Sequence, residues 1–245
     1  MRTPLALLCL PCAGASASMY LRWQRLVPAW LSIVPIELPG RGTRTAEPAA
    51  DSFETLIDDL CRQHQHRCNE RYALFGHSMG ALLAYSMAVR WRTQQRQSPE
   101  LLFVSASPAP RWREPAYFAD KQTDASLIAE LRTQGGTPAE VFEDAELLAI
   151  TLDTLRTDYR ICAGFRYRPT APLDVAIHAL AGRRDRIGEE RILAWQTETR
   201  RRFDAWWFEG GHFFIREHES SVLRTLIHAL SGDLREECDV TVASV

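Results

Sequence analysis

Short apolar runs alternate with longer stretches of helical spacing along this chain. The apolar runs have the length of buried strands, and the stretches between them repeat apolar residues at intervals of three and four. This alternation predicts an α/β fold, with a mostly parallel sheet and helices on both faces. The predicted strands cover residues 5–10, 72–75, 101–105, 175–181 and 205–208, and the predicted helices cover residues 81–88, 126–132, 138–165 and 189–199.

The alternation is interrupted between the strands 101–105 and 175–181. Helical spacing dominates there, and Gly135-Gly136 separates two helical pieces. An insertion after a strand of a parallel sheet lies above the strand ends, so we expect residues 111–168 to form a helical lid with the two glycines as a hinge. The alternative is that these helices simply pack on the sheet. We expect one domain over residues 1–232, since α/β folds of this size are often single domains, and a variable tail over residues 233–245.

The pattern Gly76-His77-Ser78-Met79-Gly80 lies between a predicted strand and a predicted helix. Strand, sharp turn and helix are the context of a nucleophile elbow, in which the serine points out of a strained turn. The glycines allow the strand and the helix to approach closely. The sequence therefore predicts an α/β-hydrolase fold with Ser78 as the nucleophile. His77 is expected to pack beside it.

A serine nucleophile needs a base and an acid, which follow it in the order acid, then histidine, in this fold. Asp185 comes just after the strand 175–181, and His212 comes after two glycines at the end of the strand 205–208. His212 would take the Ser78 proton, and Asp185 would orient the imidazole. The competing acids precede strands or fall in a helical pattern, namely Asp174, Asp204, Asp153 and Asp158.

An oxyanion hole is the third requirement. The backbone N–H of Met79, the residue after the nucleophile, is the expected first donor, and the loop after an early strand supplies the second. The strand 5–10 runs into the small-residue turn Pro11-Cys12-Ala13-Gly14-Ala15-Ser16. We expect the N–H of Ala13 to be the second donor, with Cys12 as the alternative.

Composition narrows the function classes. The 245 residues carry a net charge of −2, which argues against general nucleic-acid binding. The apolar run 5–10 is shorter than the roughly 7–15 residues of a secretory signal core, and no run has the roughly 18 apolar residues of a membrane span. The six cysteines lack metal-ligand spacing. We therefore expect a cytoplasmic monomer with reduced thiols and with no metal or cofactor.

From about residue 7 to 230 the chain resembles the type II thioesterases, the stand-alone editing hydrolases of nonribosomal peptide and polyketide synthases. The elbow is common to many hydrolases, whereas the Leu-Pro-Gly-Arg-Gly segment at 38–42 and the Gly-Gly-Thr-Pro segment at 135–138 are more specific. The matching segments are Leu10-Pro11-Cys12-Ala13-Gly14, Leu38-Pro39-Gly40-Arg41-Gly42, Gly76-His77-Ser78-Met79-Gly80, Gly135-Gly136-Thr137-Pro138, Tyr159-Arg160, Tyr167-Arg168-Pro169 and Gly210-Gly211-His212-Phe213-Phe214.

The resemblance implies hydrolysis of acyl groups from the phosphopantetheine arms of acyl or peptidyl carrier domains, which would be the partners. The acyl chain would lie under the lid against Met79, Leu148 and Phe214. The alternatives are a medium-chain acyl-CoA or acyl carrier thioesterase, a carboxylesterase, and a binding protein that has lost catalysis. Carrier domains are usually acidic, so basic side chains near the predicted rim are candidate contacts, namely Arg111, Arg113, Arg183, Arg184 and Arg186.

Overall fold

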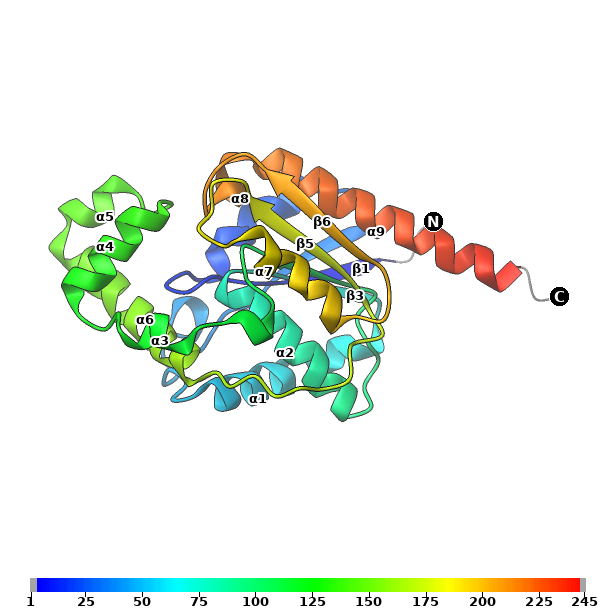
Figure 1. Cartoon of the computed structure of the whole chain (residues 1–245), viewed down its shortest axis with the longest axis horizontal. Coiled ribbons are helices and arrows are strands. Elements are labelled where there is room, and N and C mark those ends of the chain that lie inside the picture. Colours follow the sequence, from blue (N-terminus) through cyan, green and yellow to red (C-terminus); the bar gives the residue numbers. More distant parts are fainter. Residues whose placement is uncertain (1–3, 243–245) are drawn as a thin grey trace.

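Within residues 4–242, six parallel strands form one sheet in the order β2-β1-β3-β4-β5-β6 (Figure 1). The computed structural model describes the backbone of these residues and the side chains of residues 4–232. The parallel sheet confirms the fold class predicted from the sequence. The strands are β1 (Leu5–Leu10), β2 (Leu31–Pro35), β3 (Tyr72–His77), β4 (Leu101–Ser105), β5 (Ala176–Gly182) and β6 (Phe203–Phe208).

Strand β2 is absent from the sequence-based prediction. It pairs with β1 alone and forms one edge of the sheet. Its last residue is Pro35, and proline is tolerated on an edge strand because one side of that strand needs no ladder hydrogen bond. An edge strand with a proline gives a weaker apolar signal than the central strands.

Helices cover both faces of the sheet, as Figure 1 shows. Every side chain of β1 is buried, as expected for a central strand of a parallel sheet. Leu8 and Leu10 belong to the apolar cluster on the side of α1 (Phe53–His64) and α2 (Met79–Thr93). Leu7 and Cys9 belong to the cluster on the side of α9 (Glu219–Val242).

Shorter elements connect these layers. Helix α7 (Glu189–Leu193) follows β5, and α8 (Phe214–Glu217) follows β6. The 3-10 helices are η1 (Ala17–Arg25), η2 (Gly42–Arg44), η3 (Gln65–Asn69), η4 (Pro110–Trp112) and η5 (Ala194–Glu198).

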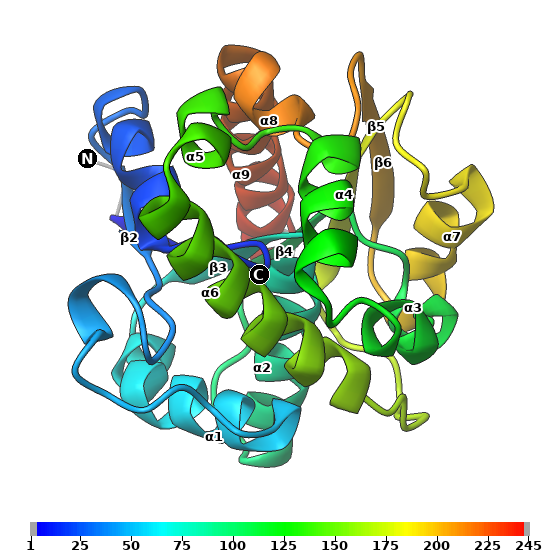
Figure 2. The ribbon, with the colours of Figure 1, turned by 90° about the vertical axis from the view of Figure 1, so that its left-hand side faces the viewer.

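The insertion between β4 and β5 contains α3 (Pro115–Ala119), α4 (Asp124–Gln134), α5 (Ala139–Glu143) and α6 (Ala145–Gly164). These helices lie together beyond the carboxyl ends of the strands (Figures 1 and 2). The sequence predicted one helical piece over residues 138–165, but the structure divides it. The Asp144 carboxylate accepts the N–H groups of Glu146 and Leu147, so it caps α6 and starts a separate helix.

Helix α9 continues through residues 233–242 of the expected tail. The side chains of those residues, and residues 243–245 altogether, lie outside the described part of the chain, so the tail stays a prediction. Across the described residues, no helix combines the length and the apolar character that crossing a bilayer requires.

Candidate active site

Ser78 lies in a strained turn between β3 and α2. Its φ of 57° and ψ of −111° place a non-glycine residue at positive φ, a conformation that costs about 1–3 kcal/mol. The turn fits only because its flanking glycines lack a Cβ. A Cβ on Gly76 would lie 2.0 Å from the Gly80 carbonyl oxygen, and a Cβ on Gly80 would lie 2.2 Å from the carbonyl oxygen of Leu10. The elbow is thereby pressed against the end of β1.

His212 and Asp185 form a close pair at the ends of the neighbouring strands β6 and β5. Nδ1 of His212 lies 2.8 Å from Oδ2 of Asp185, and their side chains are 11% and 6% exposed. A Cβ on Gly182 would lie 2.3 Å from the Gly211 carbonyl oxygen, so a bare backbone at this position lets the two loops meet.

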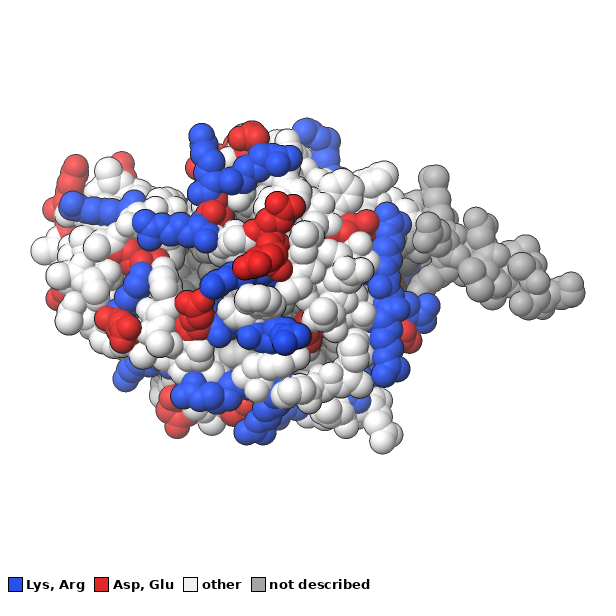
Figure 3. Space-filling view, in the orientation of Figure 1, with Lys and Arg blue, Asp and Glu red and all other residues white. Residues whose placement is uncertain are grey.

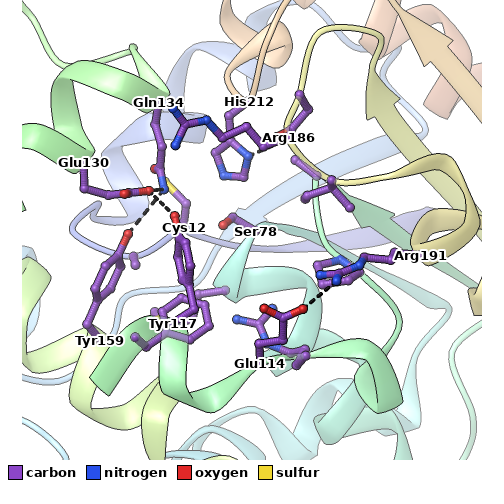
Figure 4. A pocket seen from close by; sticks show the side chains of 18 of the residues that line it. Cys12, Ser78, Glu114, Tyr117, Glu130, Gln134, Tyr159, Arg186, Arg191 and His212 are labelled. Atoms are coloured by element: carbon purple, nitrogen blue, oxygen red, sulfur yellow. Dashed lines mark hydrogen bonds and ion pairs between the residues drawn. The ribbon is translucent and has the colours of Figure 1, made fainter. Parts of the chain in front are cut away.

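An ionised carboxylate only accepts hydrogen bonds, so Nδ1 of His212 is the donor toward Asp185. The other ring nitrogen, Nε2, then carries the lone pair. It is buried and has no hydrogen-bond partner among the described residues. Ser78 and His212 line the same pocket, and Figure 4 shows both side chains facing it. The arrangement leaves Nε2 free to take a proton from a group in the pocket.

The competing acids all have other surroundings. Asp158 pairs with Arg41 in the protein interior, and Asp174 pairs with Arg201 at the surface. Asp204 of β6 contacts Arg202 and, on the neighbouring strand β5, His178, and Asp153 is exposed. None of these four carboxylates lines the pocket that holds Ser78. Asp185 is therefore the acid that the described structure brings to His212.

His77 is a packing residue next to His212. Its side chain is fully buried, and its Nδ1 lies 2.9 Å from the Ser105 hydroxyl. Burial lowers the pKa of His77 well below its usual value, so the ring is neutral. Its centroid lies 5.3 Å from that of His212. This environment matches the packing role expected from the sequence.

Two backbone N–H groups near Ser78 are the candidate oxyanion donors. Met79 is the first residue of α2, where the helix leaves N–H groups without intrahelical partners. Ala13 lies in a turn that closes with a 3.1 Å hydrogen bond from Ala15 N–H to Cys12 O. Met79, Ala13 and Cys12 all line the pocket with Ser78. The choice between Ala13 and Cys12 as second donor stays a prediction.

The helices inserted between β4 and β5 form the pocket wall opposite Ser78, Asp185 and His212. Tyr117 of α3 donates to Oε1 of Glu130 at 2.5 Å, and Lys121 pairs with Oε2. Gln134 bridges Glu130 and the Tyr159 hydroxyl (Figure 4). Burial alone would raise the pKa of Glu130, but hydrogen bonds from Lys121 and Tyr117 leave it below its usual value. This wall of the pocket is therefore not purely apolar, because it contains the Glu130 carboxylate, whose charge is balanced by Lys121.

Two expected substrate contacts are corrected by the structure. Leu148 is not among the pocket residues and packs partly against the apolar cluster of the lid. Phe214 is fully buried and stacks on Phe208, with ring centroids 5.1 Å apart. Phe213 lines the pocket instead. The two phenylalanines lie at the start of α8, where consecutive side chains diverge, so the sequence alone could not choose between them.

The expected basic rim is also corrected in part. Arg113 lines the pocket and donates to the Ser107 hydroxyl at 3.1 Å, so it is not an outer rim residue. Arg186 lies at the pocket, and Arg191 there pairs with Glu114 (Figure 4). Arg111 and Arg184 are exposed. Figure 3 shows basic and acidic side chains interspersed on this face of the molecule.

Residues 6–230 match the family model for the thioesterase domain. The chain belongs to the thioesterase family. It is 32% identical to the gramicidin S biosynthesis protein GrsT of Aneurinibacillus migulanus over 227 residues. The aligned region covers 92% of this chain and 89% of GrsT.

Solved structures give the same answer. ClbQ from the colibactin NRPS/PKS pathway is 28% identical, with a TM-score of 0.88 over 94% of this chain and 98% of ClbQ. The type II thioesterase BorB from the borrelidin biosynthetic cluster is 36% identical, with a TM-score of 0.84 over 93% of each chain. The predicted membership of the type II thioesterases, and with it hydrolysis of thioesters, is confirmed.

The role of Asp185 can be tested against a matched aspartate. We expect Asp185→Asn to lower kcat roughly 10²–10⁴-fold, because the amide stabilises the wrong tautomer of His212. Asp174→Asn, at an exposed ion pair, is the control and should stay close to the parent enzyme. Steady-state kinetics on an aryl ester measures both. A larger loss in Asp174→Asn would show that Asp185 is not the acid.

The Gly135-Gly136 turn offers a second matched pair. Both glycines have positive φ, 72° and 80°, so alanine strains the backbone at either position. A Cβ at Gly135 meets nothing within 4 Å, whereas a Cβ at Gly136 would lie 2.6 Å from the Phe213 ring. We expect similar losses of Tm, but only Gly136→Ala should lower kcat, roughly 10-fold or more, by displacing Phe213 beside His212. Equal turnover in the two variants would contradict this coupling.

Proposed function

We propose that this thioesterase removes acyl groups from the phosphopantetheine arms of carrier domains and so clears stalled nonribosomal peptide or polyketide synthases. The observation that carries the proposal is the His212–Asp185 pair at 2.8 Å beside a strained Ser78, all facing one pocket. The pathway names of GrsT, ClbQ and BorB support a carrier-bound substrate.

In the proposed mechanism, His212 Nε2 takes the Ser78 proton while Oγ bonds to the thioester carbonyl carbon. The carbonyl oxygen becomes an oxyanion, which accepts hydrogen bonds from the N–H groups of Met79 and Ala13; losing one such donor costs about 10²–10³ in rate. The carbon–sulfur bond then breaks, and the leaving thiolate receives the proton from His212. This leaves an acyl group on Ser78.

Water completes the cycle. His212 takes a proton from water as the water oxygen bonds to the acyl carbon, and collapse of the second oxyanion returns the proton to Ser78. Asp185 orients the ring in both halves. Apart from the proton transfers through His212, every bond that breaks or forms in these steps is at the acyl carbon, and no step requires a cofactor.

The lid function also belongs to the proposal. The pocket wall formed by α3, α4 and α6 supports closure of residues 111–168 over the acyl group. We further propose a cytoplasmic monomer. Among the side chains of residues 4–232, five buried free thiols support a reducing compartment, namely Cys9, Cys12, Cys61, Cys68 and Cys162.

The decisive experiment compares Ser78→Ala with the parent enzyme on three substrates that share an acyl group: an acyl carrier domain, the acyl-CoA and an aryl ester. We expect the parent enzyme to have the highest kcat/KM on the carrier. Ser78→Ala should stay folded and lose several orders of magnitude on all three, because the triad acts as a unit. Equal kcat/KM on carrier and acyl-CoA would favour a free acyl-CoA thioesterase instead.

The contribution of rim charge is tested separately. Arg111→Glu with Arg184→Glu should lower kcat/KM on the carrier roughly 10-fold at low salt and much less at high salt, since exposed charges steer association. The matched control changes Arg96 and Arg200 to glutamate. Both are exposed and precede β4 and β6, so they lie at the amino ends of the strands, away from the pocket. The aryl-ester rate should stay constant in both variants. Equal losses on the carrier in both variants would remove this rim from the docking surface.

A further inference from the structure

Arg41 and Asp158 form a buried ion pair outside the pocket that holds Ser78, Asp185 and His212. Arg41 Nη1 and Nη2 donate to the two carboxylate oxygens of Asp158 at 2.6 and 2.5 Å. Asp158 is fully buried, and Arg41 is 9% exposed. Asp158 belongs to lid helix α6, whereas Arg41 lies in the loop after β2, so the pair joins the lid to the main body.

The same two side chains also bind the turn that carries the candidate oxyanion donor Ala13. Asp158 Oδ2 accepts the N–H of Gly14 at 2.7 Å, and Arg41 Nη1 donates to the carbonyl oxygen of Ala15 at 3.1 Å. The turn is therefore held on both sides of Gly14, once through an N–H and once through a carbonyl group. Neither contact touches the pocket or the triad.

The geometry of the turn explains why these contacts matter. The Ala15 N–H bonds to Cys12 O, and Gly14 at the third position has a φ of 76°, which is the pattern of a type II turn. Type I and type II turns differ by a flip of the central peptide, here the one between Ala13 and Gly14. The Gly14 N–H belongs to that peptide, so Asp158 holds it in the type II orientation. The Ala13 N–H belongs to the preceding peptide, and the two contacts act on it by fixing the position of the turn through the residues that follow Ala13.

We infer that Asp158 and Arg41 are positioning residues that keep the Ala13 N–H directed at the developing oxyanion. This inference rests on the proposed serine mechanism. It assigns a role in catalysis to an acid that is excluded from the triad. A displacement of about 1 Å in a catalytic donor can cost 10²-fold in rate, so loss of the pair should lower kcat with little change in KM.

The test compares the buried Arg41–Asp158 pair with a partly buried ion pair of the same region, Arg44–Asp59. Asp158→Asn breaks the pair with Arg41, and Asp59→Asn breaks a contact of 2.7 Å with Arg44, which is 8% exposed and makes no described contact with residues 11–16. Both variants should lose thermal stability. Only Asp158→Asn should lower kcat on an aryl ester, by roughly 10–10²-fold at nearly constant KM.

A second readout excludes a merely structural effect. A fluorophosphonate reacts with Ser78 through a transition state whose phosphoryl oxygen occupies the oxyanion hole, so its labelling rate should fall in parallel with kcat. Asp59→Asn should label at the parent rate. Parent values of kcat and labelling rate in folded Asp158→Asn would overturn the inference. Ser78→Ala run alongside keeps the two proposals apart, because normal turnover there would instead defeat the serine mechanism.

If Asp158→Asn does not fold, a double variant takes its place in the test. Substituting a whole buried ion pair by apolar residues is often tolerated, so the double variant Arg41→Met with Asp158→Leu should retain a cooperative melting transition. It removes both contacts with the turn at Gly14 and Ala15. The expected result is the same loss of kcat and of labelling rate. A folded double variant with the kcat of the parent enzyme would overturn the inference.

Discussion

The shared direction of the six strands is the constraint on which the site depends. In a parallel sheet the carboxyl ends of all strands lie on the same side, and ligands bind beyond those ends. Strands β1, β3, β5 and β6 each end there and lead directly to Ala13, Ser78, Asp185 and His212. Residues separated by up to two hundred positions therefore line one pocket. Bare backbone at positions such as Gly182 lets the loops approach closely enough for their side chains to meet.

Strand direction is also the reason that the sequence alone could single out three residues that the structure brings to one pocket. Ser78, Asp185 and His212 each follow an apolar run, so a local pattern gives both the residue and the edge of the sheet on which it lies. Asp174 and Asp204 lie at the opposite, amino ends of their strands, where the structure pairs them with arginines. The competing carboxylates could be separated without any knowledge of distances.

The remaining features depend on contacts that leave no local pattern. Arg41 and Asp158 are separated by 117 positions, and no local pattern in either segment indicates that the two side chains pair. Glu130 likewise looks like a solvated residue of a helix, yet the folded lid buries it against Lys121 and Tyr117. Burial of a charge becomes visible only when its partner is known, because an unpaired charge would not be buried at all.

These buried contacts tie the helices inserted between β4 and β5 to the loops that carry Ala13 and His212. Helix α6 reaches the oxyanion turn through Asp158, and the Gly135-Gly136 turn reaches the histidine loop through Phe213 and Arg216. Breaking a buried ion pair by separating its partners is costly. If the proposed closure preserves the Arg41–Asp158 pair, α6 stays in place and the part of residues 111–168 that moves is α3, α4 and α5. Tyr117 of α3 and Glu130 of α4 line the pocket, so such a movement would open this wall of the pocket. The turn that carries Ala13 would keep its geometry.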